Sequence, residues 1–263
     1  MIITTGDATS PHIIEQARQL AVELGYPFLE RGNDSLPRMQ RKYADDEFLV
    51  LSNAGARFKK LNKADITYHP SMAYLRAKRL LSGESDPMIE ASGVQPGDTV
   101  LDCTAGLGSD ALVFAVAVGE SGSVTAVESE HSLYAVVHMG LQLYETENEI
   151  VSQAMKRIEM RYAHHGELLA SLPDRSFDVV YFDPMFRSPV EESSSINPLR
   201  VLANHDALAH DVIAEACRVA RKSVVMKELR YSKEFARLGF TRLVRTGSKL
   251  AYGVIEIADN NSE

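Results

Sequence analysis

A glycine-containing loop directly after a short apolar run constrains the fold more than any other feature of the chain. The apolar run is 99–101, and the loop spans 102–110 with Gly106 and Gly108 at its centre. Glycine allows a tight turn and lets the backbone approach a ligand that a Cβ atom would exclude. An acid, Glu128, ends the next strand-like run, 20 residues after the second glycine. This order predicts a nucleoside-cofactor site on a parallel sheet, with Glu128 accepting hydrogen bonds from two ribose hydroxyls.

A second motif follows another strand-like run. Residues 177–182 combine β-branched and aromatic side chains in a short apolar run, which is typical of a buried strand in a parallel sheet. The tetrapeptide Asp183-Pro184-Met185-Phe186 leaves at its carboxyl end, where open α/β sheets bind their ligands. It is similar to the Asp/Asn-Pro-Pro-aromatic loop of methyltransferases that act on exocyclic amines of nucleobases.

The residue types of this tetrapeptide suit methyl transfer to an aryl amine. Such an amine is a poor nucleophile because its lone pair is delocalised into the ring. A carboxylate and a backbone carbonyl that accept its two N–H bonds direct the lone pair toward the methyl group, while an aromatic side chain stacks on the base. We therefore expect three catalytic residues: Asp183 as acceptor, Pro184 through its carbonyl and Phe186 as the stacking face.

The glycine loop by itself is also compatible with a dinucleotide site. Residues 106–111 satisfy the Gly-x-Gly-x-x-Ala form of that fingerprint, with Glu128 as the ribose acid. Two carboxylates favour S-adenosylmethionine instead. Asp102 at the strand end suits a cofactor with an amino group and would repel a pyrophosphate, and Asp110 adds a second negative charge near the helix start.

Together the two motifs resemble those of a known family. Asp-x-Thr-Ala-Gly-Leu-Gly-x-Asp at 102–110 and Asp-Pro-Met-Phe at 183–186 look like RsmJ, a family of Rossmann-like enzymes that methylate the N2 amine of a guanosine in small-subunit ribosomal RNA. The resemblance covers residues from about 96 to 230. Ser109 and Ser129 stand where the family pattern leads us to expect arginines, and 165–166 replaces small hydroxyl residues, so the chain is interpreted as a divergent member.

The resemblance implies S-adenosylmethionine as cofactor and RNA as partner, specifically the small ribosomal subunit or its ribosomal RNA. The motifs and the resemblance together give these cofactor-binding residues: Asp102, Thr104, Gly106, Gly108, Ser109, Asp110, Glu128, Ser129, His165, Gly166 and Asp183. The predicted function is methylation of an exocyclic base amine of RNA, most specifically guanine N2. The alternatives are methylation of another nucleic acid or a small-molecule amine, or a non-catalytic RNA- or ribosome-binding protein that retains a nucleotide pocket.

The distribution of charge is more informative than the net charge of −8. Residues 53–80 hold seven basic residues against one acid, and residues 215–249 hold ten against three. Basic segments with interleaved aromatic residues suit a surface that follows an RNA backbone, although charge runs more often form a solvated face. The expected RNA-contacting residues are Lys59, Lys60, Arg76, Arg79 and Lys227.

Composition excludes several other classes of protein. With 45% hydrophobic residues among 263, the chain can bury a sizeable core. Two cysteines, Cys103 and Cys217, predict neither a disulfide framework nor a metal site. The start of the chain lacks a secretory pattern, and no apolar stretch approaches the ~20 residues that span a bilayer. We expect a cytoplasmic protein without metal or membrane contact; the oligomeric state is left open.

The expected fold class is α/β: a Rossmann-like class I methyltransferase with a mostly parallel seven-stranded sheet and an antiparallel C-terminal edge. A small α+β N-terminal subdomain (1–95), a candidate RNA-contacting region, precedes the cofactor-binding domain (96–263). In the first part we expect strands 2–5 and 47–52, a turn at Gly55, and helices 11–24, 72–81 and 87–91. In the second part we expect strands near 99–103, 123–128, 158–163, 177–182, 222–227, 238–245 and 251–257, helices near 109–118, 130–144, 149–157 and 204–220, and a mobile loop over 187–203.

Overall fold

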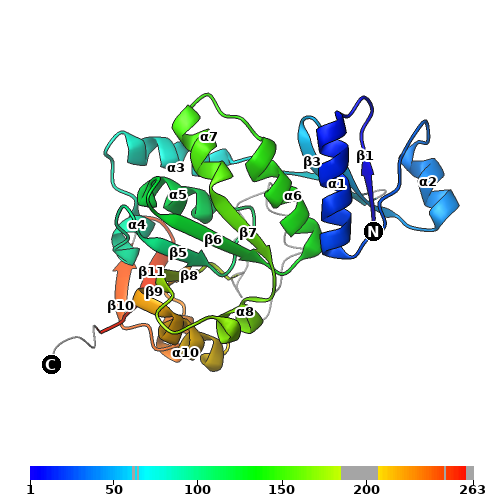
Figure 1. Ribbon diagram of the computed structural model, residues 1–263. Helices are drawn as coiled ribbons and strands as arrows, with labels where there is room; N and C mark the ends of the chain where they lie inside the picture. The colour runs from blue at the N-terminus through cyan, green and yellow to red at the C-terminus, as the bar shows by residue number, and fades with distance from the viewer. Residues whose placement is uncertain (61–62, 64, 185–206, 246, 259–263) are drawn as a thin grey trace.

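A seven-stranded sheet forms the centre of the molecule in the computed structural model, which describes residues 1–60, 63, 65–184, 207–245 and 247–258 (Figure 1). Its strand order is β10-β11-β9-β8-β5-β6-β7. The bounds are β5 Thr99–Asp102, β6 Ser123–Glu128, β7 Ile158–Tyr162, β8 Phe177–Phe182, β9 Ala220–Leu229, β10 Arg242–Arg245 and β11 Leu250–Glu256. Strands β5 to β9 run parallel, whereas β11 is antiparallel to both β9 and β10. The predicted fold class, with its antiparallel C-terminal edge, is confirmed.

The strand order reverses between β5 and β8. Strands β6 and β7 extend the sheet on one side of β5, while β8 and β9 extend it on the other. In open α/β sheets, ligands bind in the crevice outside the carboxyl ends of the strands at such a reversal. The glycine loop leaves β5 and the Asp-Pro loop leaves β8, so both motifs lie at this point.

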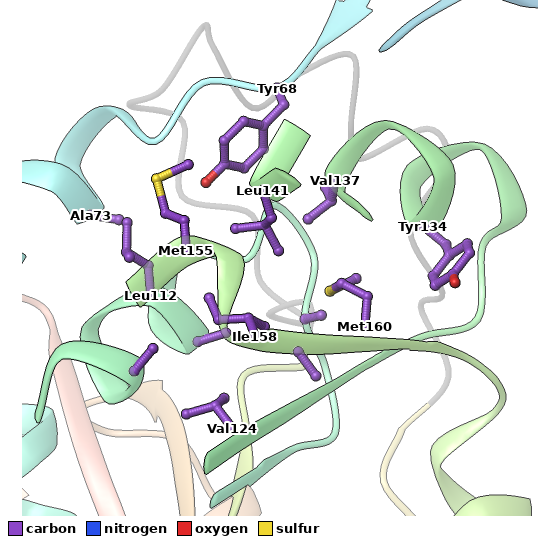
Figure 2. Close-up of a cluster of buried hydrophobic side chains, with 14 of the residues drawn as sticks. Tyr68, Ala73, Leu112, Val124, Tyr134, Val137, Leu141, Met155, Ile158 and Met160 are labelled. Atoms are coloured by element: carbon purple, nitrogen blue, oxygen red, sulfur yellow. The ribbon is translucent and has the colours of Figure 1, made fainter. Parts of the chain in front are cut away.

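Helices cover both faces of the large sheet (Figure 1). Their bounds are α3 Ser71–Leu81, α4 Pro87–Ser92, α5 Ser109–Val118, α6 His131–Leu143, α7 Glu149–Lys156, α8 His165–Ser171, α10 His210–Val219 and α11 Glu234–Arg237. Helix α5 has buried residues on nearly every side because it lies between the sheet and α3. Its Leu112 packs with Val124, Met155 and Ile158 in the main core (Figure 2). No helix in the described part of the chain has the length and apolarity to cross a membrane.

A second, four-stranded sheet is built from the N-terminal residues. Its order is β1-β2-β3-β4, with β1 Ile2–Thr5, β2 Glu47–Ser52, β3 Gly55–Lys60 and β4 Ile66–Thr67, accompanied by α1 Pro11–Leu24 and α2 Leu36–Tyr43. This sheet packs against α6, where Gly140 makes room for Tyr68. A Cβ atom at Gly140 would lie 2.2 Å from Tyr68 Cβ. On the α1 side, Tyr134 of α6 donates a hydrogen bond to Glu23.

Among the described residues, five elements were not predicted: α2, β3, β4, α8 and α11. Gly55 was expected in a turn, but Asn53 and Ala54 form that turn and Gly55 begins β3. Strand β3 buries only Ala56 and Phe58 fully, which is too short an alternation to predict a strand. The strand expected over 238–245 begins only at Arg242, because α11 and a turn occupy the preceding residues.

Two further predictions concern segments that lie wholly or partly outside the described residues. The expected loop over 187–203 lies outside them, as does the beginning of the helix expected over 204–220; the described helix begins at His210. The domain boundary near residue 95 stays a prediction. Helices α3 and α4 precede it in the sequence, yet they pack against α5, β9 and β11.

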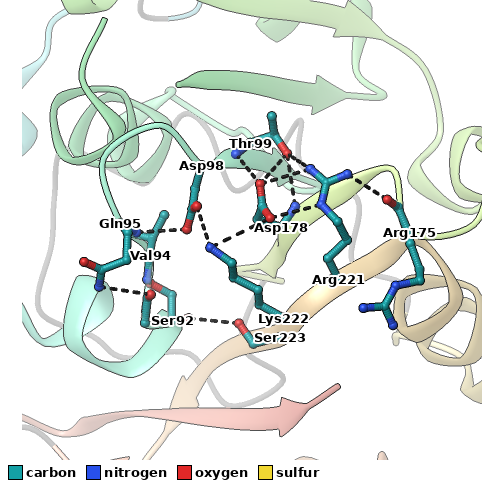
Figure 3. A network of polar contacts seen from close by, with 11 residues as sticks. Ser92, Val94, Gln95, Asp98, Thr99, Arg175, Asp178, Arg221, Lys222 and Ser223 are labelled. Carbon is teal, nitrogen blue, oxygen red and sulfur yellow. Dashed lines mark hydrogen bonds and ion pairs between the residues drawn. The ribbon is translucent and has the colours of Figure 1, made fainter. Parts of the chain in front are cut away.

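The amino ends of β5, β8 and β9 are joined by a polar network (Figure 3). Asp178 accepts hydrogen bonds from the backbone N–H of Thr99 at 2.8 Å and from both sides of the Arg221 guanidinium at 3.0 Å. Arg221 holds the pKa of Asp178 well below its usual range. In the next position of β9, Lys222 forms a 2.5 Å ion pair with Asp98. These contacts fix the strands at the edge opposite the two motifs.

Candidate active site

Backbone hydrogen bonds hold the glycine loop to the ends of the neighbouring strands. The backbone N–H of Cys103 donates to the Tyr181 carbonyl of β8 at 2.9 Å, and that of Ala105 donates to the Val127 carbonyl of β6 at 2.9 Å. The strand reversal therefore places the loop between β6 and β8. Gly106 has φ +51° and Gly108 has φ +69°, a region that favours glycine. Ser109 follows as the first residue of α5.

Glu128 ends β6 and closes one side of the loop. Its side chain accepts hydrogen bonds from the backbone N–H of Gly106 at 3.1 Å and of Glu130 at 2.8 Å. Burial raises the pKa of Glu128, and these N–H bonds oppose the rise. A carboxylate has about four lone-pair positions, so the Glu128 side chain has room for a further donor. The geometry suits ribose hydroxyls, and Ser129 lies next to it in the sequence.

Asp102 is 1% exposed at the end of β5. Its Oδ1 accepts a hydrogen bond from the Thr104 N–H at 3.0 Å, whereas Oδ2 is buried without a hydrogen-bond partner among the described residues. Burial, with smaller contributions from Asp110 and Asp183, raises the pKa of Asp102 to about 8. A buried carboxyl oxygen without a partner is costly unless a ligand brings a donor to it. The amino group of S-adenosylmethionine fits this requirement.

Asp183 follows β8 and faces the glycine loop. Its backbone N–H donates to Thr104 Oγ1 at 2.5 Å, which joins the loops after β5 and β8. Its Oδ2 lies 2.6 Å from Lys227 Nζ. Burial raises the pKa of Asp183, and Lys227 opposes that rise. Pro184 is half-buried beside it, whereas Phe186 lies outside the described residues.

Lys227 and Arg76 connect Asp183 to the start of α5. Lys227 Nζ also lies 3.0 Å from Asp110 Oδ2, and Arg76 Nη1 lies 2.5 Å from Asp110 Oδ1. Tyr181 donates its hydroxyl hydrogen to Asp110 Oδ2 at 2.7 Å. Burial disfavours the charged form of Asp110, but Lys227 and Arg76 outweigh it and hold its pKa well below the usual range. We call Arg76, Asp110, Lys227 and Asp183 the ion-pair chain.

The predicted residues His165 and Gly166 begin α8, with two residues between it and the end of β7. The His165 ring stacks on His164 at 4.4 Å and meets the Phe182 ring edge-to-face at 6.0 Å. Burial lowers the pKa of His165 to about 4, so its imidazole is neutral near pH 7. The described residues contain no group of three His, Cys, Asp or Glu side chains that could hold a metal ion.

Three of the five residues expected to contact RNA lie outside the ion-pair chain. Lys59 pairs with Asp65 at 2.9 Å, and Lys60 pairs with Glu47 at 2.8 Å. Arg79 is 68% exposed on α3. Arg76 and Lys227 instead belong to the buried ion-pair chain. Their inward position explains why a count of basic residues overstates the charge that this part of the surface presents.

Tyr181 and Asp86 are site residues that sequence reasoning did not identify. Asp86 accepts two hydrogen bonds from the Arg76 guanidinium, at 2.8 and 3.0 Å, and caps α4 through the Met88 N–H. In the sequence, Tyr181 is indistinguishable from the other aromatic residues of the predicted strand. Asp86 precedes Pro87, which is a typical helix-start signal, and this was the only local indication that either residue has a special role.

A cavity of about 810 Å³ lies next to the carboxyl end of β9, one residue beyond Lys227. It is lined by residues 228–234 and 247–249. Tyr231 is 83% exposed there.

The strand order and the loops after β5, β6 and β8 define a class I S-adenosylmethionine-dependent methyltransferase. The fold is similar to that of the crystal structure of the SAM-dependent methyltransferase NGO1261 from Neisseria gonorrhoeae, with a TM-score of 0.64 and 19% identity, covering 100% of this chain and 99% of that one. A family model described as "Putative SAM-dependent methyltransferase" matches residues 39–246. The chain belongs to this family of methyltransferases, and its cofactor is S-adenosylmethionine rather than a dinucleotide.

Curated relatives extend the comparison. The chain is 43% identical over 97% of its length to "Uncharacterized protein YpiP" of Bacillus subtilis (strain 168), 99% of which is covered. It is 30% identical over 74% of its length to the ribosomal RNA small subunit methyltransferase J of Tolumonas auensis, 81% of which is covered. The corresponding protein of Shewanella amazonensis is 32% identical over 62% of this chain and 66% of its own. The predicted resemblance to a divergent RsmJ-like methyltransferase is confirmed.

Proposed function

We propose that the protein transfers a methyl group from S-adenosylmethionine to an exocyclic base amine of RNA, with guanine N2 of small-subunit ribosomal RNA as the target. One observation carries the proposal: the Thr104–Asp183 hydrogen bond at 2.5 Å joins the cofactor loop to the Asp-Pro loop. In this proposal, the residue that accepts the substrate amine therefore lies beside the cofactor. The distant relatives named ribosomal RNA small subunit methyltransferase J support RNA as the substrate.

The residues around the glycine loop suit the cofactor. Glu128 would hold the ribose hydroxyls, and the buried Oδ2 of Asp102 would meet the amino group. Further contacts are proposed from the loop glycines and from Ser109, Ser129, His165 and Gly166. Both Asp110 oxygens are already bound by protein side chains, so we propose that Asp110 acts through the ion-pair chain. Bound S-adenosylmethionine supplies an electrophilic methyl group on a sulfonium.

Catalysis is proposed to come mainly from positioning. The Asp183 carboxylate accepts one N–H of the substrate amine, the Pro184 carbonyl accepts the second, and Phe186 stacks on the base. The methylated amine becomes acidic and loses its extra proton late, to water or to Asp183. None of these roles requires a strong general base.

RNA contact is proposed from the N-terminal sheet and from α3. Lys59 and Lys60 lie on β3, and that sheet packs on α6, which starts three residues after Glu128. Surface ion pairs are weak, so their lysines can exchange a carboxylate partner for a phosphate. Arg79 is exposed on α3. With ribosomal RNA as the substrate, the proposed location is the cytoplasm.

Methyl transfer to RNA from cells that lack the protein tests the proposal. Tritiated S-adenosylmethionine is supplied with small subunits or naked RNA, and mass spectrometry of the nucleosides identifies the product. We expect N2-methylguanosine; labelling of a small-molecule amine alone would support the alternative. Asp183→Ala should lower transfer by about two orders of magnitude or more while most cofactor affinity remains. Near-normal turnover in that variant would remove Asp183 from the mechanism.

A further inference from the structure

Lys227 is a buried lysine whose charge faces inward. Its side chain is 16% exposed, and its Nζ lies 2.6 Å from Asp183 Oδ2 and 3.0 Å from Asp110 Oδ2. Burial of an ammonium is costly unless carboxylates compensate it. The two carboxylates come from different elements, the loop after β8 and the first turn of α5. Lys227 on β9 therefore links the substrate side of the site to the cofactor side.

Asp110 is a fixed anchor for this link. Arg76 of α3 and Tyr181 of β8 both bind it, and the Arg76 guanidinium is itself fixed by Asp86. Asp183 has fewer constraints: among the described residues, Lys227 is the one side chain that binds its carboxylate, and the Asp183 side chain is 28% exposed. The ammonium thus connects a rigid carboxylate to the one that has to receive a substrate.

We propose that Lys227 is a positioning residue for methyl transfer: held by Asp110, its ammonium keeps the Asp183 carboxylate ionised and oriented to accept the substrate amine. This inference rests on the proposed function for the role of Asp183. It replaces the expectation that Lys227 contacts RNA phosphate.

The neighbouring charges make the protonation state of Asp183 depend on Lys227. The charged and titratable groups that face the cluster are Lys227, Asp110, Arg76, Asp102, Tyr181 and Tyr252. Burial and Asp110 raise the pKa of Asp183, while Lys227 lowers it. Without Lys227, Asp183 and Asp110 would be neighbouring carboxylates with one cation fewer, which favours protonation of Asp183. A protonated carboxyl group is a poor acceptor for the amine.

The same strand provides a matched control. Lys222 also extends from β9 and forms a short ion pair with an aspartate, Asp98, at 2.5 Å (Figure 3). It lies at the amino edge of the sheet, within the polar network. Lys222→Met therefore removes an ion pair of the same kind from the same strand at a place remote from the two motifs.

The experiment compares wild type, Lys227→Met, Lys227→Arg and Lys222→Met in single-turnover methyl transfer with saturating cofactor from pH 5.5 to 9. In Lys227→Met we expect the acidic limb of the rate profile to move to higher pH by about one unit or more, with partial recovery of the rate at high pH. Lys227→Arg keeps the charge and should keep the limb near the wild-type position. Lys222→Met should keep the wild-type profile. A Lys227→Met rate reduced by the same factor at every pH would overturn the proposal.

A second readout does not depend on activity. Carboxyl ¹³C NMR of aspartate-labelled protein, with Asp183→Asn to assign the signal, follows the titration of Asp183 directly. The midpoint should move upward in Lys227→Met and stay near wild type in Lys227→Arg; an unchanged midpoint in Lys227→Met overturns the inference. Lys227→Gln, which also lacks the charge, serves in the same way if the methionine variant does not fold. If the wild-type protein does not methylate RNA but the Asp183 midpoint still moves in Lys227→Met, the proposed function is refuted. The electrostatic link between Lys227 and Asp183 would then stand by itself.

Discussion

Binding of S-adenosylmethionine should release a proton from Asp102. This aspartate is 1% exposed, its Oδ2 has no hydrogen-bond partner among the described residues, and burial raises its pKa to about 8. Near pH 7 the cofactor-free protein therefore holds Asp102 mainly in its neutral form. If the cationic amino group of the cofactor binds beside it, the ionised form is favoured. Affinity should then rise with pH up to about 8.

The magnitude follows from this pKa. If the cofactor binds only the protein with Asp102 ionised, its apparent affinity is lower than the affinity well above pH 8. The reduction is about elevenfold at pH 7 and about a hundredfold at pH 6. Affinity should rise about ninefold between pH 6 and pH 7, equal to about 1.3 kcal/mol. About 0.9 protons should leave the protein per cofactor bound at pH 7. His165, with a pKa lowered to about 4, is neutral throughout this interval and adds no slope.

Isothermal titration calorimetry measures both quantities. Titrations at pH 6 and 7, each in two buffers with different ionisation enthalpies, give the affinity and the number of protons released. Asp102→Asn has nearly the same shape and cannot ionise, so it should bind more weakly, with neither the slope nor the proton release. A wild-type affinity that does not change between pH 6 and 7 would falsify the assignment of Asp102 to the cofactor amine.

Three further predictions concern binding and packing. Glu128→Ala should weaken S-adenosylmethionine binding by ~1–3 kcal/mol in calorimetry, since charge-assisted hydrogen bonds to the ribose are lost; unchanged affinity would assign the ribose to another residue. Reversal of Lys59 and Lys60 to Glu should weaken RNA binding and flatten its dependence on salt, with cofactor affinity intact. Equal RNA affinity in that variant would make this surface a solvated face only. Gly140→Ala should lower the free energy of unfolding by ~1–3 kcal/mol, because its Cβ would meet Tyr68 at 2.2 Å; denaturation with urea tests this, and wild-type stability would contradict it.

The sequence by itself determined the large sheet and the carboxyl-edge position of its motifs. Strand β5, its glycine loop and α5 form one contiguous unit, and the same is true of β8 with Asp183. Apolar runs, glycines and a following proline are local signals, because they act through backbone conformation and hydrophobic pattern within a few residues. Once parallel strands are assigned, the carboxyl ends that carry Asp102, Glu128 and Asp183 meet at one edge.

Some short elements were not predicted, because they depend on tertiary contacts more than on local sequence patterns. Strand β3 is stabilised by pairing with β2 and β4 and by packing on α6, rather than by a strong alternating pattern of its own. Helix α8 spans only His165–Ser171 and buries Leu169 alone. Short segments with few apolar residues take their conformation from tertiary contacts, which a local pattern does not contain.

Only the tertiary structure decided the partners of the charged residues. Arg76 and Asp110 are 34 positions apart in the sequence, Lys227 and Asp183 are 44 apart, and Lys227 and Asp110 are 117 apart. A sequence shows the charge of Arg76 and Lys227 but not whether they face RNA or a buried carboxylate. Electrostatic interaction depends on distance and burial in the folded chain, and both are set by how α3, α5, β8 and β9 pack together.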